Sequence, residues 1–428
     1  MPDVLQHNPF EHAPFLGQLK EHKTAVIVDY DRTLTTGNRN PNQQELSDQE
    51  DIWRITRQAN AVDGCISART PGMMMDTERY MASAANGYGE LLPRLHKDPA
   101  TDRYQYRDPA TIPFYKNAVN RKIIGSFGWG ILVEDGKGYR VDKTYEQMLS
   151  LDVPLKQKVN GSNVQGFVDL SAPPVSELEV PSTWRLAAMT FIVEHCLRFR
   201  GHLAPIESIE RYHEMKTDVA PPPYRTQFDF VGRAGHAKLL ELKKIIRRQK
   251  ELINLFALRL HTIDESRINE EDPEQSRYTL YMVPWYGRKE NMFNWMLKQC
   301  TSAARLAPSD MNLFYAGDSL TDLKVGLWGG GDARVQFVLP AGSVLAPYLV
   351  GRRKKYGVVD LSFLWANPTI KRLEPRLMPT GRSGEYRFVL RARGGRQNTL
   401  VIADERYPNL TPPGSVAAFL EEYLLKRK

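Results

Sequence analysis

The sequence predicts an α/β protein, and three observations support this class. Apolar segments at 24–28 and 61–66 flank a helical pattern at 49–60, which gives the order strand, helix, strand. The alternation returns in the C-terminal third, where we expect buried strands at 312–316, 334–339 and 398–403. Parallel strands need a crossover between them, usually a helix, so this order favours a Rossmann-like parallel sheet with both faces covered.

The remaining elements follow from the same periodicities. Helices are predicted where apolar residues recur every three to four positions, at 71–80, 182–200, 237–260, 290–300 and 414–425. Short β-rich runs separated by glycines at 122–139 predict hairpins, and 278–284 predicts one further strand.

The chain is long enough for more than one domain. Its 428 residues exceed what one hydrophobic core usually supports. We expect residues 1–140 and 284–428 to form the core, with a basic insertion near 351–396. Residues 141–283 hold proline-rich joints and strong helical patterns, so we expect them to form an inserted α+β cap domain.

Composition excludes several protein classes. No apolar run is long enough to cross a bilayer, and the first ten residues lack the apolar core of a signal peptide. Cys65, Cys196 and Cys300 are scattered and form neither a disulfide framework nor a metal-binding spacing. We therefore expect a cytoplasmic protein with no membrane partner. The sequence predicts no oligomeric state.

The formal net charge of +8 permits two interpretations. One is nucleic-acid binding, and the other is the handling of an anionic small molecule. The clearest basic runs, at 243–248 and 352–355, lack the interleaved aromatic residues of a base-stacking platform. We expect a small phosphorylated substrate and no nucleic-acid partner.

The strongest local signal is Asp29-Tyr30-Asp31-Arg32-Thr33, directly after the first predicted strand. Ligands of open α/β sheets bind at the carboxyl ends of the strands. Two carboxylates placed there repel each other unless a cation or a chemical task justifies them. Mg²⁺ suits such a site because it prefers oxygen ligands. The alternative is an ordinary Asp-rich turn.

Three weaker signals follow strands or open helices. Asp318 and Asp322 share one face of a helix that begins after the strand at 312–316. Ser67 ends the second strand, where a hydroxyl and free backbone N–H groups can bind an anion. Lys289 stands at a helix start, which the helix dipole disfavours unless an anion lies there. Each has a plain alternative, namely a helix cap for Asp318 and Ser67 and a solvated side chain for Lys289.

In their order along the chain, the four signals resemble the four motifs of the haloacid dehalogenase superfamily. That family has an Asp-x-Asp-x-Thr loop, then Ser or Thr, then Lys, then Gly-Asp-x-x-x-Asp. The resemblance covers the predicted core. The long interval between Ser67 and Lys289 is similar to the C2-capped branch, which includes sucrose-phosphate and trehalose-phosphate phosphatases. Arg32 departs from the pattern, because the family usually has glycine there.

The resemblance implies a Mg²⁺-dependent phosphomonoester hydrolase acting on a phosphorylated sugar or a similar metabolite. Asp29 would be the nucleophile that forms an aspartyl-phosphate, and Asp31 the general acid and base. Ser67, Lys289 and Thr33 would bind the phosphate. The metal site would comprise Asp29, Asp31 through its backbone carbonyl, Asp318 and Asp322, with orientation of Lys289 as an alternative role for Asp322. A phosphotransferase or mutase of the same superfamily, or a non-catalytic binding protein on this scaffold, remains an alternative.

Overall fold

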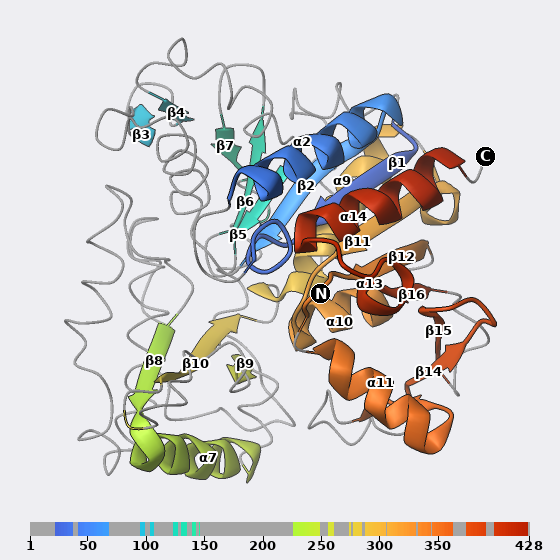
Figure 1. The fold of residues 1–428 in the computed structure, drawn as a ribbon. Coiled ribbons are helices and arrows are strands. Elements are labelled where there is room, and N and C mark those ends of the chain that lie inside the picture. The colour runs from blue at the N-terminus through green and yellow to red at the C-terminus, as the bar shows by residue number, and fades with distance from the viewer. Residues whose placement is uncertain are drawn as a thin grey trace.

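The computed structural model gives the fold of this chain (Figure 1). The structure describes residues 22–36, 42–67, 95–98, 103–106, 123–126, 130–134, 139–142, 145, 226–248, 256–260, 274, 277–284, 287–304, 306–330, 333–343, 345–362, 374–390 and 398–426. The helices predicted at 71–80 and 182–200 lie outside these residues.

Thirteen of the described strands form one sheet, in the order β13-β14-β15-β16-β12-β11-β1-β2-β5-β6-β7-β4-β3. The strands from β16 to β5 in this order pair in parallel and form its centre. Their bounds are β1 (Thr24–Val28), β2 (Val62–Ser67), β5 (Ile123–Ser126), β11 (Asn312–Ala316), β12 (Arg334–Leu339) and β16 (Thr399–Ile402). The predicted α/β class is confirmed, and each strand predicted for this centre is present.

Antiparallel strands extend the sheet on both sides. On one side the predicted hairpins form from β6 (Gly130–Glu134), β7 (Tyr139–Val141), β4 (Arg103–Tyr106) and β3 (Leu95–Asp98). On the other side lie β15 (Glu385–Val389), β14 (Arg376–Pro379) and β13 (Val359–Asp360). The described part of the basic segment 351–396 therefore adds strands to the core sheet.

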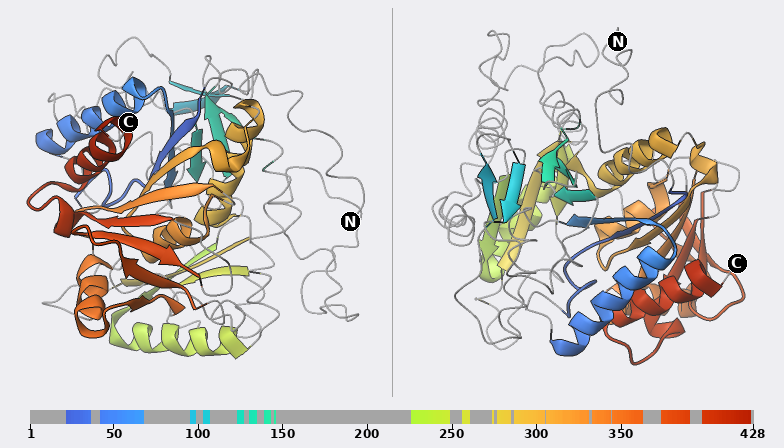
Figure 2. Two further views of the ribbon diagram at one scale, coloured as in Figure 1. Left: turned by 90° about the vertical axis from the view of Figure 1, so that its right-hand side faces the viewer. Right: turned by 90° about the horizontal axis from the view of Figure 1, so that it is seen from above.

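Helices cover both faces of the parallel centre (Figure 2). On one face, α2 (Gln43–Gln58) packs against α14 (Pro412–Leu420), which continues into a π-helical turn at Glu421–Lys426. On the other face lie α9 (Lys289–Ala304) and α10 (Leu320–Trp328). Side chains of a strand alternate between faces, so Phe314 packs on Phe419 of α14 while Tyr315 packs on Phe293 of α9.

The start of α2 shows why this helix is longer than predicted. The helix begins at Gln43, six positions before the predicted start at Gln49. Asn42 Oδ1 accepts a hydrogen bond from Glu45 N at 2.9 Å, and Glu45 Oε2 accepts one from Asn42 N at 2.7 Å. This reciprocal pair is a capping box, which satisfies two backbone donors that the helix itself leaves unpaired. Asn42-x-x-Glu45 is thus a start signal that the apolar periodicity does not contain.

A second sheet forms within the predicted inserted domain. It has the order β8-β10-β9, from β8 (Thr226–Val231), β10 (Arg277–Pro284) and β9 (Phe256–Leu260), and α7 (Gly232–Arg248) packs on β8 and β10. The helix predicted at 237–260 is therefore wrong at its C-terminal end. Phe256–Leu260 alternates as a strand and pairs antiparallel with β10, and this pairing overrides the local helical pattern.

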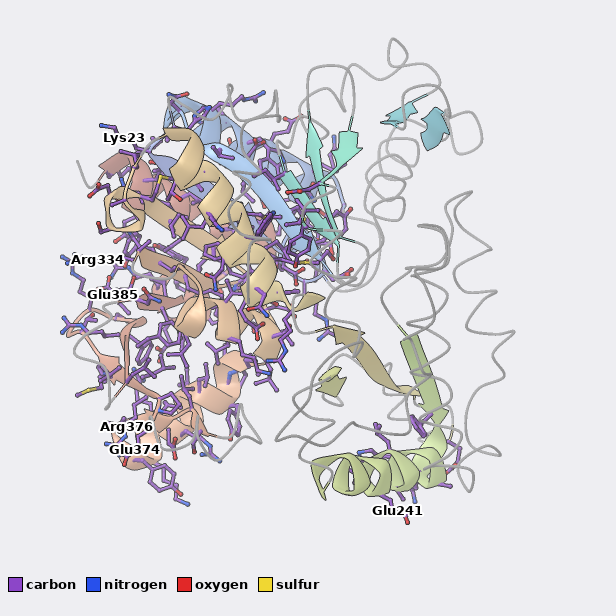
Figure 3. The ribbon with its side chains drawn as sticks, turned by 180° about the vertical axis from the view of Figure 1, so that it is seen from behind. Lys23, Glu241, Arg334, Glu374, Arg376 and Glu385 are labelled. Atoms are coloured by element: carbon purple, nitrogen blue, oxygen red, sulfur yellow. The ribbon has the colours of Figure 1, made fainter. Side chains whose placement is uncertain are left out.

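The two sheets are oriented so that the parallel strands end toward the second sheet. In Figure 3, Lys23 and Arg334 mark the amino ends of β1 and β12, on the side of the molecule away from α7, which carries Glu241. Pro284 is the last residue of β10, and Lys289 is the first residue of α9. The five positions that separate them can bridge roughly 18 Å at most.

The remaining described helices are short or lie at the edge of the sheet. They are α11 (Leu345–Tyr356), α13 (Ala403–Arg406) and a 3₁₀ turn at Pro308–Asp310. Within the described part of the chain, no helix combines the length and the apolar character that a membrane span needs.

Candidate active site

Asp29 and Asp318 follow the carboxyl ends of two adjacent parallel strands. β1 and β11 pair in register as far as Val28 and Ala316, and Asp29 N donates to Ala316 O at 2.8 Å. Gly317 follows Ala316, so Asp318 lies at the same edge of the sheet. Both carboxylates are buried. The predicted meeting of the first and fourth motifs is therefore present in the structure.

Lys289 joins these motifs through two ion pairs. Its Nζ lies 2.7 Å from Asp29 Oδ2 and 2.8 Å from Asp322 Oδ1, and all three side chains are at least 94% buried. A buried ammonium is stable only where carboxylates compensate the loss of its hydration. Lys289 opens α9 beside the sheet edge, so its charge is directed at the acidic residues there. The alternative of a solvated lysine is excluded.

Asp322 is held by four donors. Its Oδ1 accepts from Lys289 Nζ and from Tyr315 OH, at 2.8 and 2.5 Å. Its Oδ2 accepts from Ser319 N at 3.1 Å and from Ser319 Oγ at 2.5 Å. A β-carbon on Gly317 would lie 2.4 Å from Asp322 Cγ, so only glycine leaves room for this carboxylate. The glycine of the Gly-Asp-x-x-x-Asp motif thus has a packing reason.

Three buried oxygen atoms in the same loops have no hydrogen-bond partner among the residues that the structure describes. They are Asp29 Oδ1, Asp318 Oδ2 and Thr33 Oγ1. One carboxylate oxygen from each of Asp29, Asp318 and Asp322 lies within 4.8 Å of the other two. A buried carboxylate oxygen without a donor is costly, and a bound cation removes that cost. The donor set is composed of hard oxygen atoms, which fits Mg²⁺.

The charge balance of the cluster shifts the pKa values of its acids. Burial, and then the charge of Asp322, raises the pKa of Asp29 to about 7 despite Lys289. Burial and the charge of Asp29 also raise the pKa of Asp318 well above its usual range. Asp322 is buried as well, yet Lys289 and the donors around it lower its pKa. Three carboxylates therefore face one ammonium, and the excess negative charge favours a bound cation.

The other predicted residues lie on the same loops or strand ends. Ser67 is the last residue of β2, the parallel neighbour of β1, and it is buried. Thr33 is fully buried in the turn after β1, and Asp31 is half-buried there. The charge of Asp31 raises the pKa of Asp29, so the two carboxylates interact.

Arg32 has an uncommon backbone conformation within this turn. Its φ is +54°, in the left-handed region that glycine adopts without strain. For other residues this region costs roughly 1–2 kcal/mol. A glycine at this position would adopt the same conformation without that cost. Arg32 adopts it at a cost and adds a positive charge that lowers the pKa of Asp318.

Tyr315 and Ser319 are members of the cluster that the motifs did not predict. The sequence pattern predicts Tyr315 only as part of a buried strand. A tyrosine in an otherwise apolar buried strand nevertheless needs an acceptor for its hydroxyl, and that need was the available signal. Ser319 directly precedes α10, and its contacts with Asp322 include the capping contact at the start of that helix.

Comparison with known proteins gives distant structural matches. No protein-family model matches the chain, and no curated protein matches it in sequence. A haloacid dehalogenase-like hydrolase from Bacillus subtilis is 13% identical with a TM-score of 0.36, covering 80% of this chain and 98% of that chain. Trehalose-6-phosphate phosphatase from Aspergillus fumigatus is 13% identical with a TM-score of 0.34, covering 78% and 89%.

A third match is IMP-nucleotidase from Plasmodium falciparum, 9% identical with a TM-score of 0.33, covering 76% of this chain and 60% of that one. At these identities and TM-scores the matches assign no activity to this chain.

Proposed function

We propose that this chain is a Mg²⁺-dependent phosphatase that hydrolyses phosphate monoesters through an aspartyl-phosphate on Asp29. The observation that supports this function best is the buried contact of Lys289 with Asp29 at a strand end, beside oxygen atoms to which no described residue donates a hydrogen bond. An ion pair that only stabilised the fold would not explain buried carboxylate oxygens without a donor. A site that binds a cation and a phosphoryl group needs them.

We assign the cation to Asp29 and Asp318, because Asp29 Oδ1 and Asp318 Oδ2 are buried and have no donor within the described part of the chain. The backbone carbonyl of Asp31 is the third proposed ligand. The oxygens of Asp322 already accept from four donors, so we assign Asp322 to Lys289 and not to the cation. When bound, Mg²⁺ would neutralise the carboxylates and stabilise negative charge on the phosphoryl oxygens.

The chain's own residues account for the first chemical step. An oxygen of Asp29 attacks phosphorus, and the bond between phosphorus and the leaving oxygen breaks. Asp31 donates a proton to that oxygen, which leaves as an alcohol. Lys289, Ser67 and Thr33 bind the phosphoryl oxygens, where charge is spread in the transition state.

In the second step, water replaces Asp29. Asp31, now a carboxylate, removes a proton from a water molecule that attacks the aspartyl-phosphate. The bond between phosphorus and Asp29 breaks, inorganic phosphate leaves and the Asp29 carboxylate is restored. The proton on Asp31 replaces the one given to the leaving group, so the cycle closes.

We further propose that residues 141–283 form a cap that selects a small phosphorylated substrate, such as a sugar phosphate. Its described strands β8, β9 and β10 make a sheet of their own. The N-terminal end of the span is tied to α9, because Trp295 Nε1 donates to Asp142 Oδ2 at 2.8 Å. The C-terminal end reaches α9 at Lys289. Both connections therefore converge on the helix that carries the phosphate-binding lysine, and closure would expel water from the site.

The direct test of the function is hydrolysis of p-nitrophenyl phosphate by wild type and by Asp29→Asn. We expect Mg²⁺-dependent turnover in the wild type and at least about a 100-fold loss in Asp29→Asn, or roughly 3 kcal/mol in the barrier. Asp51→Asn, an acid on the outer side of α2, is the matched control and should keep full activity. A variant at position 29 that keeps a tenth of wild-type turnover, or full wild-type activity in EDTA, would contradict the proposal.

Product stoichiometry separates a hydrolase from a transferase. For a hydrolase, inorganic phosphate and nitrophenol appear in equal amounts with or without added sugars. Nitrophenol release in excess of phosphate, with phosphate found on the added sugar, would favour the phosphotransferase alternative. A panel of sugar phosphates, phosphoglycerates and nucleotides, compared by kcat/KM, then tests the proposed substrate class.

A further inference from the structure

Tyr315 belongs to the buried cluster although none of the four motifs includes it. Its hydroxyl donates to Asp322 Oδ1 at 2.5 Å, and the same oxygen accepts from Lys289 Nζ at 2.8 Å. Lys289 Nζ in turn lies 2.7 Å from Asp29 Oδ2. One carboxylate oxygen thus connects the phenol of β11 with the ammonium that reaches the nucleophile.

Packing fixes the ring of Tyr315. The side chain is 1% exposed and lies on the face of the sheet that α9 covers. It stacks on Phe337 of β12 at 5.6 Å between ring centres and meets Phe293 of α9 edge-on at 5.5 Å. With aromatic neighbours from two elements in contact, the hydroxyl has little freedom to leave Asp322.

The hydroxyl is a donor throughout the pH range of enzyme assays. Burial, and then the charge of Asp322, raises the pKa of Tyr315 well above its usual range. A permanently protonated phenol beside a carboxylate donates to it in one direction only. The contact therefore fixes the position of Asp322 and does not transfer a proton.

The four donors of Asp322 come from three separate parts of the fold. Two come from Ser319 in the turn before α10, one from Lys289 on α9 and one from Tyr315 on β11. A carboxylate offers about four lone-pair positions, so the set is complete. Without Tyr315, Oδ1 would be held by Lys289 alone, and the pair could shift together relative to Asp29.

We propose that Tyr315 is a positioning residue for phosphoryl transfer, which holds Asp322 so that the ammonium of Lys289 is directed at Asp29. It acts through Asp322 and contacts neither the substrate nor the cation. The inference rests on the proposed phosphatase function and adds a residue to it. A misplacement of about 1 Å at a reacting group can cost up to about 100-fold in rate, so removal of this contact should be measurable.

The first test is Tyr315→Phe, which keeps the ring and removes the hydroxyl. We expect kcat for p-nitrophenyl phosphate to fall about 10- to 100-fold, with KM within about twofold of wild type. The matched control is Tyr386→Phe. Tyr386 is also buried in this sheet, on β15, and its hydroxyl donates to Glu405 Oε2 at 2.5 Å. This control loses the same kind of donated bond away from the cluster, together with the bond that the hydroxyl accepts from Arg353 Nη1 at 2.7 Å, and it should keep the wild-type kcat.

The second test uses the Asp322→Asn background. If Tyr315 acts through Asp322, then Tyr315→Phe should lower kcat by less than about twofold in that background, because the two changes affect one interaction. Full multiplication of the two single effects would overturn the proposal, since it would show an independent structural role. Incorporation of 3-fluorotyrosine at position 315, which retains the hydroxyl, should restore kcat to within about twofold of wild type.

The outcomes separate this inference from the proposed function. A wild type that releases no phosphate from any ester overturns both. An active wild type with a fully active Tyr315→Phe variant overturns only the role of Tyr315. A Tyr315→Phe protein that does not fold where Tyr386→Phe does would also overturn it, because the phenol would then be needed for stability alone.

Discussion

Lys289 Nζ lies 2.7 Å from Asp29 Oδ2, at the end of the first parallel strand. This contact joins the first residue of a helix on one face of the sheet to the residue that follows a central strand. The two side chains are far apart in sequence and are almost completely buried. The ion pair lies at the carboxyl edge of the sheet, where α/β proteins bind ligands, and it is therefore the centre of the site.

Removal of the ammonium should destabilise the fold as well as abolish activity. Lys289→Met leaves Asp29 and Asp322 buried without a cation, and breaking such a pair costs about 3–5 kcal/mol. Chemical denaturation with linear extrapolation measures this change. Lys298→Met, a change at an exposed lysine of the same helix, is the control and should alter the free energy of unfolding by less than about 1 kcal/mol. Equal effects at both positions would contradict the assigned role of Lys289.

Asp318→Asn should stabilise the Mg²⁺-free protein while it abolishes activity. The substitution removes one negative charge from a buried cluster in which no residue of the described ranges donates to Asp318 Oδ2. We expect a gain in unfolding free energy on the order of 1–3 kcal/mol in EDTA. We expect Mg²⁺ to raise the melting temperature of the wild type, and this rise should disappear in Asp318→Asn. Asp310→Asn, an exposed acid before β11, should retain that rise. A destabilised Asp318→Asn protein, or one that Mg²⁺ still stabilises, would be the contrary result.

The Mg²⁺-free protein should lose stability as pH rises through the acidic range. Folded Asp29 holds its proton up to a pKa of about 7, whereas the unfolded chain releases it near the model value of 3.8. The folded state therefore binds more protons in this window, and Asp29 lowers the free energy of unfolding with increasing pH, by at most about 1.4 kcal/mol per pH unit. Asp318 acts in the same direction because its pKa is also raised. Asp322 has a lowered pKa, so its contribution is lost only below this window.

Urea unfolding in EDTA at about pH 5 and about pH 8 measures this dependence. Asp29→Asn should show a smaller decrease between the two values, since an amide does not titrate. Saturating Mg²⁺ should also reduce it in the wild type. Stability that increases over this interval, or an unchanged decrease in Asp29→Asn, would show that the cluster does not carry the excess charge described here.

Asn398 should be important for stability and not for catalysis. Its side chain accepts a hydrogen bond from Val335 N and donates one to Gly326 O, both at 2.9 Å. These bonds join α10 to the start of β12. Asn398→Ala leaves a buried N–H group and a buried carbonyl unpaired, which should cost about 2–3 kcal/mol. We expect kcat per folded molecule to be unchanged. Asn312→Ala, an exposed position at the start of β11, is the control for the unfolding measurement and should change it by less than about 0.5 kcal/mol.

The central strands were predictable because each is a short apolar run bounded by polar residues. Thr24–Val28 and Asn312–Ala316 have the predicted bounds, and both lead directly into acidic motifs. Local pattern does not determine which strands become neighbours. The contact between Asp29 N and Ala316 O depends on a parallel pairing between residues nearly three hundred positions apart, which no periodicity encodes.

The differences between the predicted and the observed structure have identifiable physical causes. Phe256–Leu260 was predicted as helix because the pattern before it is helical, but pairing with β10 decides its state. The early start of α2 depends on the capping pair of Asn42 and Glu45, which periodicity does not detect. Tyr315 was hidden within a strand whose apolar character indicated only burial. Its role depends on a hydroxyl acceptor that comes from another element.

The most direct test of the central claim is to trap the phosphoryl group on the protein. Wild type is mixed with phosphate-labelled substrate and Mg²⁺, quenched in acid within one turnover, and digested for mass spectrometry. We expect one labelled peptide, which contains Asp29, and no label in Asp29→Asn. Label on another residue, or steady turnover in Mg²⁺ with no labelled peptide at any quench time, would contradict the assignment of Asp29 as the nucleophile.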